Sequence, residues 1–304
     1  MNIKDSPALL LIFTGLFLGL TFPFGKLAAE ASISPIVWAW LISFGSGIIL
    51  LISQFLRGRK VCCNIIFIKY YFWSSLFSFA VPNILIFTVI PKLGSGFTGI
   101  LFTLSPIFTL ALSSIKKVAL PNRLGTIGIL IGFIGAVIVT LTRGEVSQPA
   151  STIWLIAGLC IPLSLAVGNL YRTVGWPEGA DPIELAVGSN LSAAILLFSL
   201  LIFSGQAVLT LDLLSIKSLA IFQVIGSVAM FSIFFRLQQI GGPTYLSQIG
   251  YIAAGVALFS GTVFMNEQYS LITWFGAIVI IFGIILSILG QKDPIESALE
   301  SNKT

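Results

Sequence analysis

The apolar positions of the chain form long unbroken runs, which short groups of polar, charged and turn-forming residues separate. A helix of about 20 apolar residues is long enough to cross the hydrocarbon core of a bilayer. Ten runs reach this length, at residues 8–29, 35–56, 68–90, 94–115, 122–142, 151–173, 183–204, 214–237, 243–264 and 269–289. The pattern therefore predicts an all-α polytopic membrane protein with ten transmembrane helices.

The composition agrees with this layout and excludes several classes of protein. Of 304 residues, 57% are hydrophobic and only 9% are charged, and the mean hydropathy is +1.04. Ten spans use about 200 residues, so the connections average about ten residues each. Because none of these connections can bury a core of its own, an appended catalytic or nucleotide-hydrolysing domain is not expected.

The basic residues stand at the ends of the apolar runs and divide unequally between the two sides of the predicted membrane. Of the 16 Lys and Arg residues, one side receives only Lys26, Lys92, Arg143 and Lys217. Positive residues accumulate on the cytoplasmic side, so we expect both termini in the cytoplasm, with the protein in the inner membrane. The net charge of +5 is then explained by orientation in the lipid bilayer, and no nucleic-acid partner is expected.

The two halves of the chain carry a weak duplication. Residues 21–27 (TFPFGKL) align with residues 164–170 (SLAVGNL), and Ser34-Pro35 aligns with Asp181-Pro182, each pair a predicted helix cap followed by proline. Further matches join Gly94 to Gly241, Gly128 to Gly276 and Gly135 to Gly283. We therefore predict a first five-helix repeat at 1–145, a second at 146–290 and a cytoplasmic tail at 291–304.

An odd number of spans in each repeat makes the second copy enter the membrane in the opposite orientation. Inverted repeats provide two nearly equivalent packings, one open to each side, which is the basis of alternating access. The substrate is then expected near the middle of the membrane, between the halves.

The ends of the two repeats resemble the drug/metabolite transporter superfamily, EamA type. That family shows a proline-centred span, a Glu at the next turn, and a span with two glycines seven residues apart. The second half has Glu267, Gly276 and Gly283, with Ala254 where the family often has proline. The first half has Pro106, Gly128 and Gly135, but Ala119 replaces the Glu.

The resemblance implies a fold and a class of function. Spans one to four and six to nine would surround a central cavity, with spans five and ten at the periphery. Members of the family export amino acids, other metabolites or drugs, and helix pairs three–four and eight–nine would rock to close the cavity on alternate sides.

Uncharged polar residues in the middle of the spans are the candidates for binding substrate. Amides facing lipid would be costly, so these side chains face protein or water. The candidates are Asn83, Asn190, Gln223, Gln248 and Tyr251, with Trp40 and Tyr245 as candidates for stacking on a ligand. Hydrogen bonding between helices is the alternative role for each amide.

Three further residues are candidates for the mouth or gate. Lys26 lies near the predicted outer interface, where it either reaches toward lipid phosphates or attracts an anionic group. Asn169 is its repeat partner, and Arg172 follows one turn later at the cytoplasmic end of span six. The alternative role of Arg172 is membrane orientation. Glu30, one turn after Lys26, is its expected ion-pair partner.

The titratable residues limit the chemistry. Histidine is absent, no Asp or Glu falls near the middle of a span, and the three cysteines lack metal spacing. We therefore predict no metal and no cofactor, and no enzyme activity. A facilitator or exchanger is the simplest transport mechanism.

Helix breakers give a mechanical prediction. Pro82 and Pro106 should bend spans three and four beside Asn83 and Ser105, at the cavity. Small-residue stripes of glycine in spans five and ten predict close helix contact, as scaffold or as the seam of a homodimer.

The predicted function is export of a small amphipathic metabolite, with an amino acid or related compound as the leading substrate. Efflux of lipophilic drugs or cations is the alternative. An intramembrane transferase is a remote one, because the sequence lacks the clustered residues that such chemistry needs.

Overall fold

The computed structural model describes residues 6–116, 118, 122–142, 151–207 and 211–290. Within these ranges, eight helical segments have the length and apolar composition to cross a membrane, and two shorter apolar helices start at Arg123 and Leu271. Each of the ten predicted spans corresponds to one of these segments, which confirms the all-α, ten-helix layout. Residues 143–150 and the predicted tail at 291–304 lie outside the described ranges, so the repeat boundaries at 145 and 290 stay predictions.

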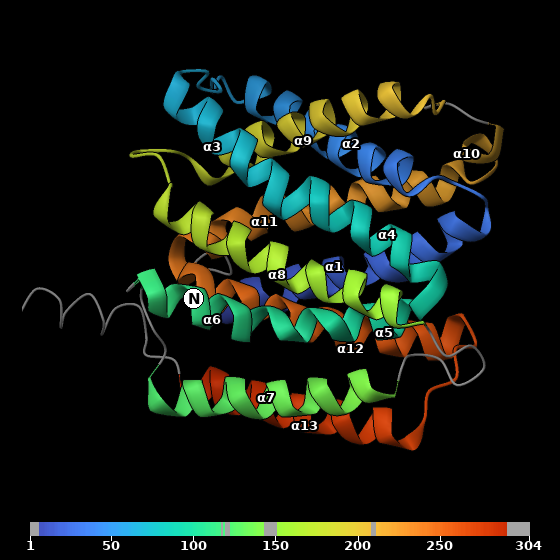
Figure 1. The fold of residues 1–304 in the computed structure, drawn as a ribbon. Coiled ribbons are helices and arrows are strands. Elements are labelled where there is room, and N and C mark those ends of the chain that lie inside the picture. Colours follow the sequence, from blue (N-terminus) through green and yellow to red (C-terminus); the bar gives the residue numbers. More distant parts are fainter. Residues whose placement is uncertain (1–5, 117, 119–121, 143–150, 208–210, 291–304) are drawn as a thin grey trace, which may run out of the picture.

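The helices follow the chain as a simple series, with short irregular turns inside the third and fourth spans (Figure 1). The first half contains α1 (Pro7–Glu30), α2 (Pro35–Leu56), α3 (Ile65–Ser75), η2 (Leu76–Ala80), α4 (Val81–Leu93), α5 (Ser95–Leu101), η3 (Phe102–Leu104), α6 (Ser105–Lys116) and α7 (Arg123–Leu141). The second half contains α8 (Thr152–Val174), α9 (Pro182–Ser204), α10 (Leu211–Ser215), α11 (Lys217–Ser247), α12 (Ile249–Phe264) and α13 (Leu271–Leu289).

Helix starts show how local sequence fixes the boundaries. Asp181 caps α9, accepting from the backbone N–H groups of Ile183 at 2.9 Å and Glu184 at 3.4 Å, with Pro182 in the first helical position. The expected cap at Ser34 is wrong, because its hydroxyl makes no bond to the start of α2. It donates instead to Gln206 Oε1 at 2.5 Å, which ties the start of α2 to the end of α9.

The two halves pack through equivalent elements. Helix α1 packs mainly against α11 and α12, and its counterpart α8 packs against α4 and α6. The counterparts α2 and α9 pack on each other, as do α7 and α13, which lie side by side at one edge of the bundle (Figure 1). Equivalent helices that contact one another are the mark of a two-fold relation between the halves.

Glycines in α7 and α13 establish the inverted direction. A side chain on Gly128 would collide with the backbone at Gly283, and one on Gly135 would collide with the backbone at Gly276. Because Gly128 is the repeat equivalent of Gly276, the equivalent positions meet crosswise, as they do in antiparallel helices. The glycine faces are thus used within one chain. A homodimer through these helices would need their other faces, and it stays a prediction.

The backbone corrects one repeat match by a single residue. Gly94, between α4 and α5, has φ 86°, and the second-half residue with a similar conformation is Gly242 with φ 68°, rather than Gly241. Only glycine adopts such a conformation at no steric cost. Gly242 divides α11 at the boundary between the eighth and ninth spans.

Two prolines produce the irregular turns in the third and fourth spans. Pro82 follows the π-helical turn η2, and Pro106 follows the 3₁₀ turn η3. Proline cannot donate to the carbonyl four residues earlier, so the regular α-helical ladder is interrupted at each place. Both interruptions lie at the central cavity, beside Asn83 and Ser105, where the sequence predicts them.

Candidate functional site

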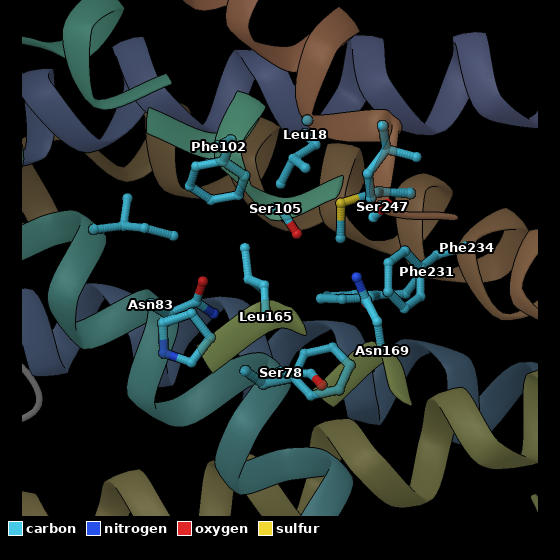
Figure 2. Close-up of a pocket in the computed structure, with 16 residues that line it drawn as sticks. Leu18, Ser78, Asn83, Phe102, Ser105, Leu165, Asn169, Phe231, Phe234 and Ser247 are labelled. Carbon is cyan, nitrogen blue, oxygen red and sulfur yellow. The ribbon is translucent and has the colours of Figure 1, made fainter. Parts of the chain in front are cut away.

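The central cavity lies between the two halves of the protein (Figure 2). Its polar lining residues are Ser78, Asn83, Ser105, Asn169 and Ser247. Its apolar lining consists of Leu18, Phe79, Pro82, Ile86, Phe102, Leu165, Met230, Phe231, Phe234, Ile249 and Gly250. These residues come from spans one, three, four, six, eight and nine, so both repeats build the site.

The lining of the cavity has the character of a small-molecule site, mostly apolar with a few polar groups. The space between its walls amounts to about 590 Å³, a volume that includes its open part. Its wall is mostly aliphatic and aromatic, with a few amide and hydroxyl groups. Ser105 and Asn169 point their polar atoms into this space (Figure 2).

A buried arginine stands directly behind the wall of the cavity. The Arg172 side chain donates to Asn169 Oδ1 at 2.7 Å, to Gln238 Oε1 at 3.1 Å and to Ser78 Oγ. Its guanidinium carbon lies 4.8 Å from the centre of the Phe234 ring. Arg172 is 0% exposed. Three of its four contacts are with side chains that line the cavity, so its charge acts on that space.

The opposite end of the bundle is closed by a network around Glu267, which we call the Glu267 latch. It consists of Glu267, Lys26, Ser95, Gly96 and Tyr269. Lys26 Nζ lies 2.8 Å from Glu267 Oε1, and the Ser95 and Gly96 N–H groups donate to the carboxylate at 2.7 and 3.0 Å. The Tyr269 hydroxyl also donates to it.

The latch joins the two repeats. Glu267, from the second half, caps the start of α5 in the first half, where unpaired N–H groups favour an anion. Burial alone would raise the pKa of Glu267, but the hydrogen bonds from Lys26, Tyr269 and the backbone of Gly96 and Ser95 outweigh it and leave the pKa lowered. The carboxylate is therefore ionised at neutral pH. The expected pair of Lys26 with Glu30 is wrong, because Glu267 takes that place.

Comparisons with known proteins give the fold and the family. One solved structure, described only as a crystal structure of a protein, is 15% identical, with a TM-score of 0.68, and the match covers 92% of this chain and 96% of that one. At this identity the likeness concerns the fold alone. None of the curated proteins compared with this sequence matches it. A family model described as the EamA-like transporter family matches residues 5–141 and again residues 152–289.

The chain belongs to the EamA-like transporter family. This family is part of the drug/metabolite transporter superfamily, so the chain is a membrane transporter of that type. The two matches, one for each half, also confirm the internal duplication.

Of the candidate binding residues, this EamA-like transporter places Asn83 at the cavity and Gln248 away from it. Gln248 Nε2 donates to Ser287 Oγ at 3.0 Å, between α12 and α13. Tyr251 is buried with its hydroxyl beside Gly132 of α7. The adjacent residues Ile249 and Gly250 do line the cavity. The sequence thus predicted the correct chain segment, around residues 248–251, but it did not predict which side chains of that segment face the cavity.

The remaining candidates also lie outside the cavity lining. Asn190 Nδ2 donates to the Ala186 carbonyl at 2.9 Å. Gln223 Nε2 donates to Ser227 Oγ at 2.9 Å and to Thr21 Oγ1 at 3.3 Å. Trp40 stacks on Phe44 with ring centres 4.7 Å apart. Tyr245 is half-buried beside Gly241.

The three residues predicted at the mouth or gate lie toward opposite ends of the helical bundle. Asn169 lines the cavity, Arg172 contacts it from behind, and Lys26 belongs to the Glu267 latch. The sequence missed Ser78, Ser247 and the aromatic wall formed by Phe79, Phe102, Phe231 and Phe234. The proximity of Ser78 to Pro82 was the available signal, because the bend at Pro82 turns that segment toward the cavity.

Proposed function

We propose that this transporter exports a small amphipathic metabolite, with an amino acid or related compound as the leading substrate, by alternating access. The central cavity is the observation that carries the proposal. It is formed by both repeats, and it combines amide and hydroxyl groups with an aromatic and aliphatic wall. An amino acid offers a polar head for the first set of groups and an apolar side chain for the second.

The tight packing at the Lys26 end of the bundle supports an alternating-access mechanism, because it closes the route to the cavity from that side. The apolar side chains next to the Glu267 latch are almost completely buried. They are 0–2% exposed, at Leu93, Phe97, Ile100 and Leu101. Access from this end requires the latch to separate, which breaks an ion pair and a helix cap between the halves. The proposed cycle opens this end while the end near Arg172 closes.

For the cellular setting we propose the inner membrane, with both termini cytoplasmic and the Glu267 latch at the outer face. The unequal distribution of Lys and Arg supports this orientation. For coupling we propose a facilitator or exchanger, since no carboxylate lines the cavity among the described residues.

Uptake into reconstituted vesicles tests the proposal. Purified protein in liposomes should accelerate the exchange of a labelled amino acid across the membrane, compared with protein-free liposomes. With the electrical potential clamped, an imposed pH gradient should drive no accumulation. Failure to move any member of an amino-acid panel would refute the proposed substrate, and accumulation driven by the pH gradient would refute the uncoupled mechanism.

Efflux of lipophilic cations remains the second candidate, favoured by the aromatic side chains Phe79, Phe102, Phe231 and Phe234. The positive charge of Arg172 behind the same wall opposes it. Transport of a labelled lipophilic cation in the same vesicles, at a rate above that of every amino acid, would favour this candidate instead.

A further inference from the structure

We propose that the cavity recognises a carboxylate group on its substrate through hydrogen-bond donors on Ser78 and Asn169. Arg172 orients both donors, and its buried positive charge attracts the carboxylate. This inference rests on the proposed function and names the chemical class of its substrate. Its starting point is the pairing of Arg172, whose hydrogen-bond partners are all neutral oxygen atoms. Within the described residues the ion pairs are Lys26–Glu267 and Arg59–Asp181, so Arg172 has no acidic partner there.

A guanidinium group can only donate hydrogen bonds, and this fixes the orientation of Asn169. The atom facing Arg172 at 2.7 Å must be the amide oxygen. The amide nitrogen then points the other way, toward the cavity, where its protein partner is Thr109 Oγ1 at 3.4 Å. Figure 2 shows this nitrogen directed into the open space. Asn169 therefore presents a donor to a ligand.

The same reasoning applies to Ser78. Its hydroxyl oxygen accepts from Arg172, so its hydrogen is directed away from the guanidinium. No acceptor for this hydrogen occurs among the described residues, and Ser78 lines the cavity. Gly168 makes the arrangement sterically feasible, because a side chain there would collide with Ser78 Oγ. Two donors thus belong to residues that line the cavity, with a buried positive charge behind both.

A carboxylate matches this arrangement. It accepts from both donors, and its charge compensates Arg172 in an environment where water screens little. A neutral amide of the same shape would present its own N–H₂ group to one of the donors and would leave the charge uncompensated. The wall formed by Met230, Phe231 and Phe234 is left for an apolar tail.

Four probes of one carbon skeleton test the inference by separating the carboxylate from the ammonium group. They are leucine, leucinamide, isocaproate and isocaproamide, with binding to the purified protein measured by calorimetry at neutral pH. Each carboxylate should bind about tenfold or more tightly than its amide, because hydrogen bonds to a charged group are the stronger kind. Equal affinity of acid and amide in both pairs, including no measurable binding of either, would overturn the inference.

The same four probes keep the two proposals distinguishable. If isocaproate binds as tightly as leucine and both exceed their amides, carboxylate recognition stands and the proposed amino-acid substrate falls. If leucinamide binds as tightly as leucine, and both bind more tightly than isocaproate and isocaproamide, carboxylate recognition falls while the proposed amino-acid substrate class stands.

Asn169→Asp is the decisive variant, because it should fold. The new carboxylate would sit beside the guanidinium, pair with Arg172 and remove the amide donor. We expect a melting temperature at or above that of the wild type, together with loss of the preference for acid over amide. Arg236→Gln is the matched control, since it changes the net charge by the same amount at a residue that binds Gln239. A preference that survives Asn169→Asp, or that Arg236→Gln abolishes equally, would overturn the inference.

Discussion

Two buried charged side chains, Glu267 and Arg172, lie toward opposite ends of the helical bundle, and their hydrogen-bond partners differ in kind. The Glu267 carboxylate pairs with the ammonium group of Lys26 and accepts hydrogen bonds from two backbone N–H groups at the start of α5. The Arg172 guanidinium donates hydrogen bonds only to neutral oxygen atoms, two of which belong to residues that line the cavity. A buried charge that the protein leaves uncompensated is an attractive position for a charged ligand.

Glu267→Gln should destabilise the protein. The variant removes the ion pair with Lys26 and weakens the cap on α5, since an amide oxygen accepts less strongly than a carboxylate. We expect a loss of about 1.5–3 kcal/mol, the usual range for a hydrogen bond to a charged group, measured as a lower melting temperature. Glu30→Gln is the control, because Glu30 is exposed at the same end of α1. Equal shifts in both variants would contradict the assigned role of the latch.

The lowered pKa of Glu267 gives a pH dependence with a definite sign. The contribution of the latch is fully present above the ordinary carboxyl pKa of 4.5 and is lost as the pH falls through the lower folded-state value. The melting temperatures of wild type and Glu267→Gln should therefore differ at pH 7 and converge in acid. A difference that stays constant down to about pH 3, well below ordinary carboxyl values, would contradict this assignment.

Asn83 and Gln248 should respond differently to the same substitution. Asn83→Leu removes a polar group from the cavity lining and is expected to reduce ligand binding with little change in stability. Gln248→Leu removes the bond to Ser287, so it should lower the melting temperature while ligand affinity is retained. Calorimetry and thermal unfolding on both variants check this, and the reverse pattern would place the binding site elsewhere.

At the scale of the helix, small residues and prolines set the shape of the bundle. Gly128, Gly135, Gly276 and Gly283 let α7 and α13 approach until their backbones touch. Pro82 and Pro106 interrupt two other spans at the cavity, where backbone groups outside the α-helical ladder are tolerated. Among the described residues, the peripheral pair is thus regular and closely packed, while the π-helical and 3₁₀ turns lie in helices that surround the cavity.

Gly283→Ala should separate α7 from α13. The added methyl group would meet the backbone of Gly128 and Gly132, which cannot move aside as a side chain can. We expect a destabilisation of about 1–3 kcal/mol. Gly255→Ala is the matched control, because nothing lies within 4 Å of a methyl group at that helical position, and alanine favours a helix over glycine by up to about 1 kcal/mol. Thermal unfolding of both variants checks this, and similar losses would contradict the assigned packing.

At the scale of the whole molecule, the two repeats contact each other at both ends of the bundle, the Lys26 end and the Arg172 end, and the two sets of contacts can be compared. The first is closed by a salt bridge and a helix cap between the repeats. The equivalent of Glu267 in the first half is Ala119, which lies outside the described residues and carries no carboxylate. The sequence itself therefore makes the two ends chemically unequal.

Opening at the Lys26 end should be measurable by labelling a cysteine in the cavity. In a variant lacking Cys62, Cys63 and Cys160, Ser105→Cys places a thiol on the cavity wall. A membrane-impermeant thiol reagent added from the Lys26 side should react slowly, and the further change Glu267→Gln should accelerate it. Adding Glu30→Gln instead serves as the control. Rates that do not change with Glu267→Gln would refute the latch as the barrier on that side.

The sequence by itself determined the ten spans, the duplication and the class of fold, because length, hydropathy and glycine spacing act locally and are strongly constrained by the bilayer. It also located Asn83 and the two proline interruptions at the cavity, whereas Asn169, which the sequence predicted as a mouth or gate residue, lines the cavity itself. Only the tertiary structure decided which faces of the helices meet the cavity. One residue along a helix turns a side chain by about 100°, so Ser247 lines the cavity and Gln248 packs against α13. The partners of Lys26 and Arg172 were likewise decided in space, since they lie on helices distant in the chain.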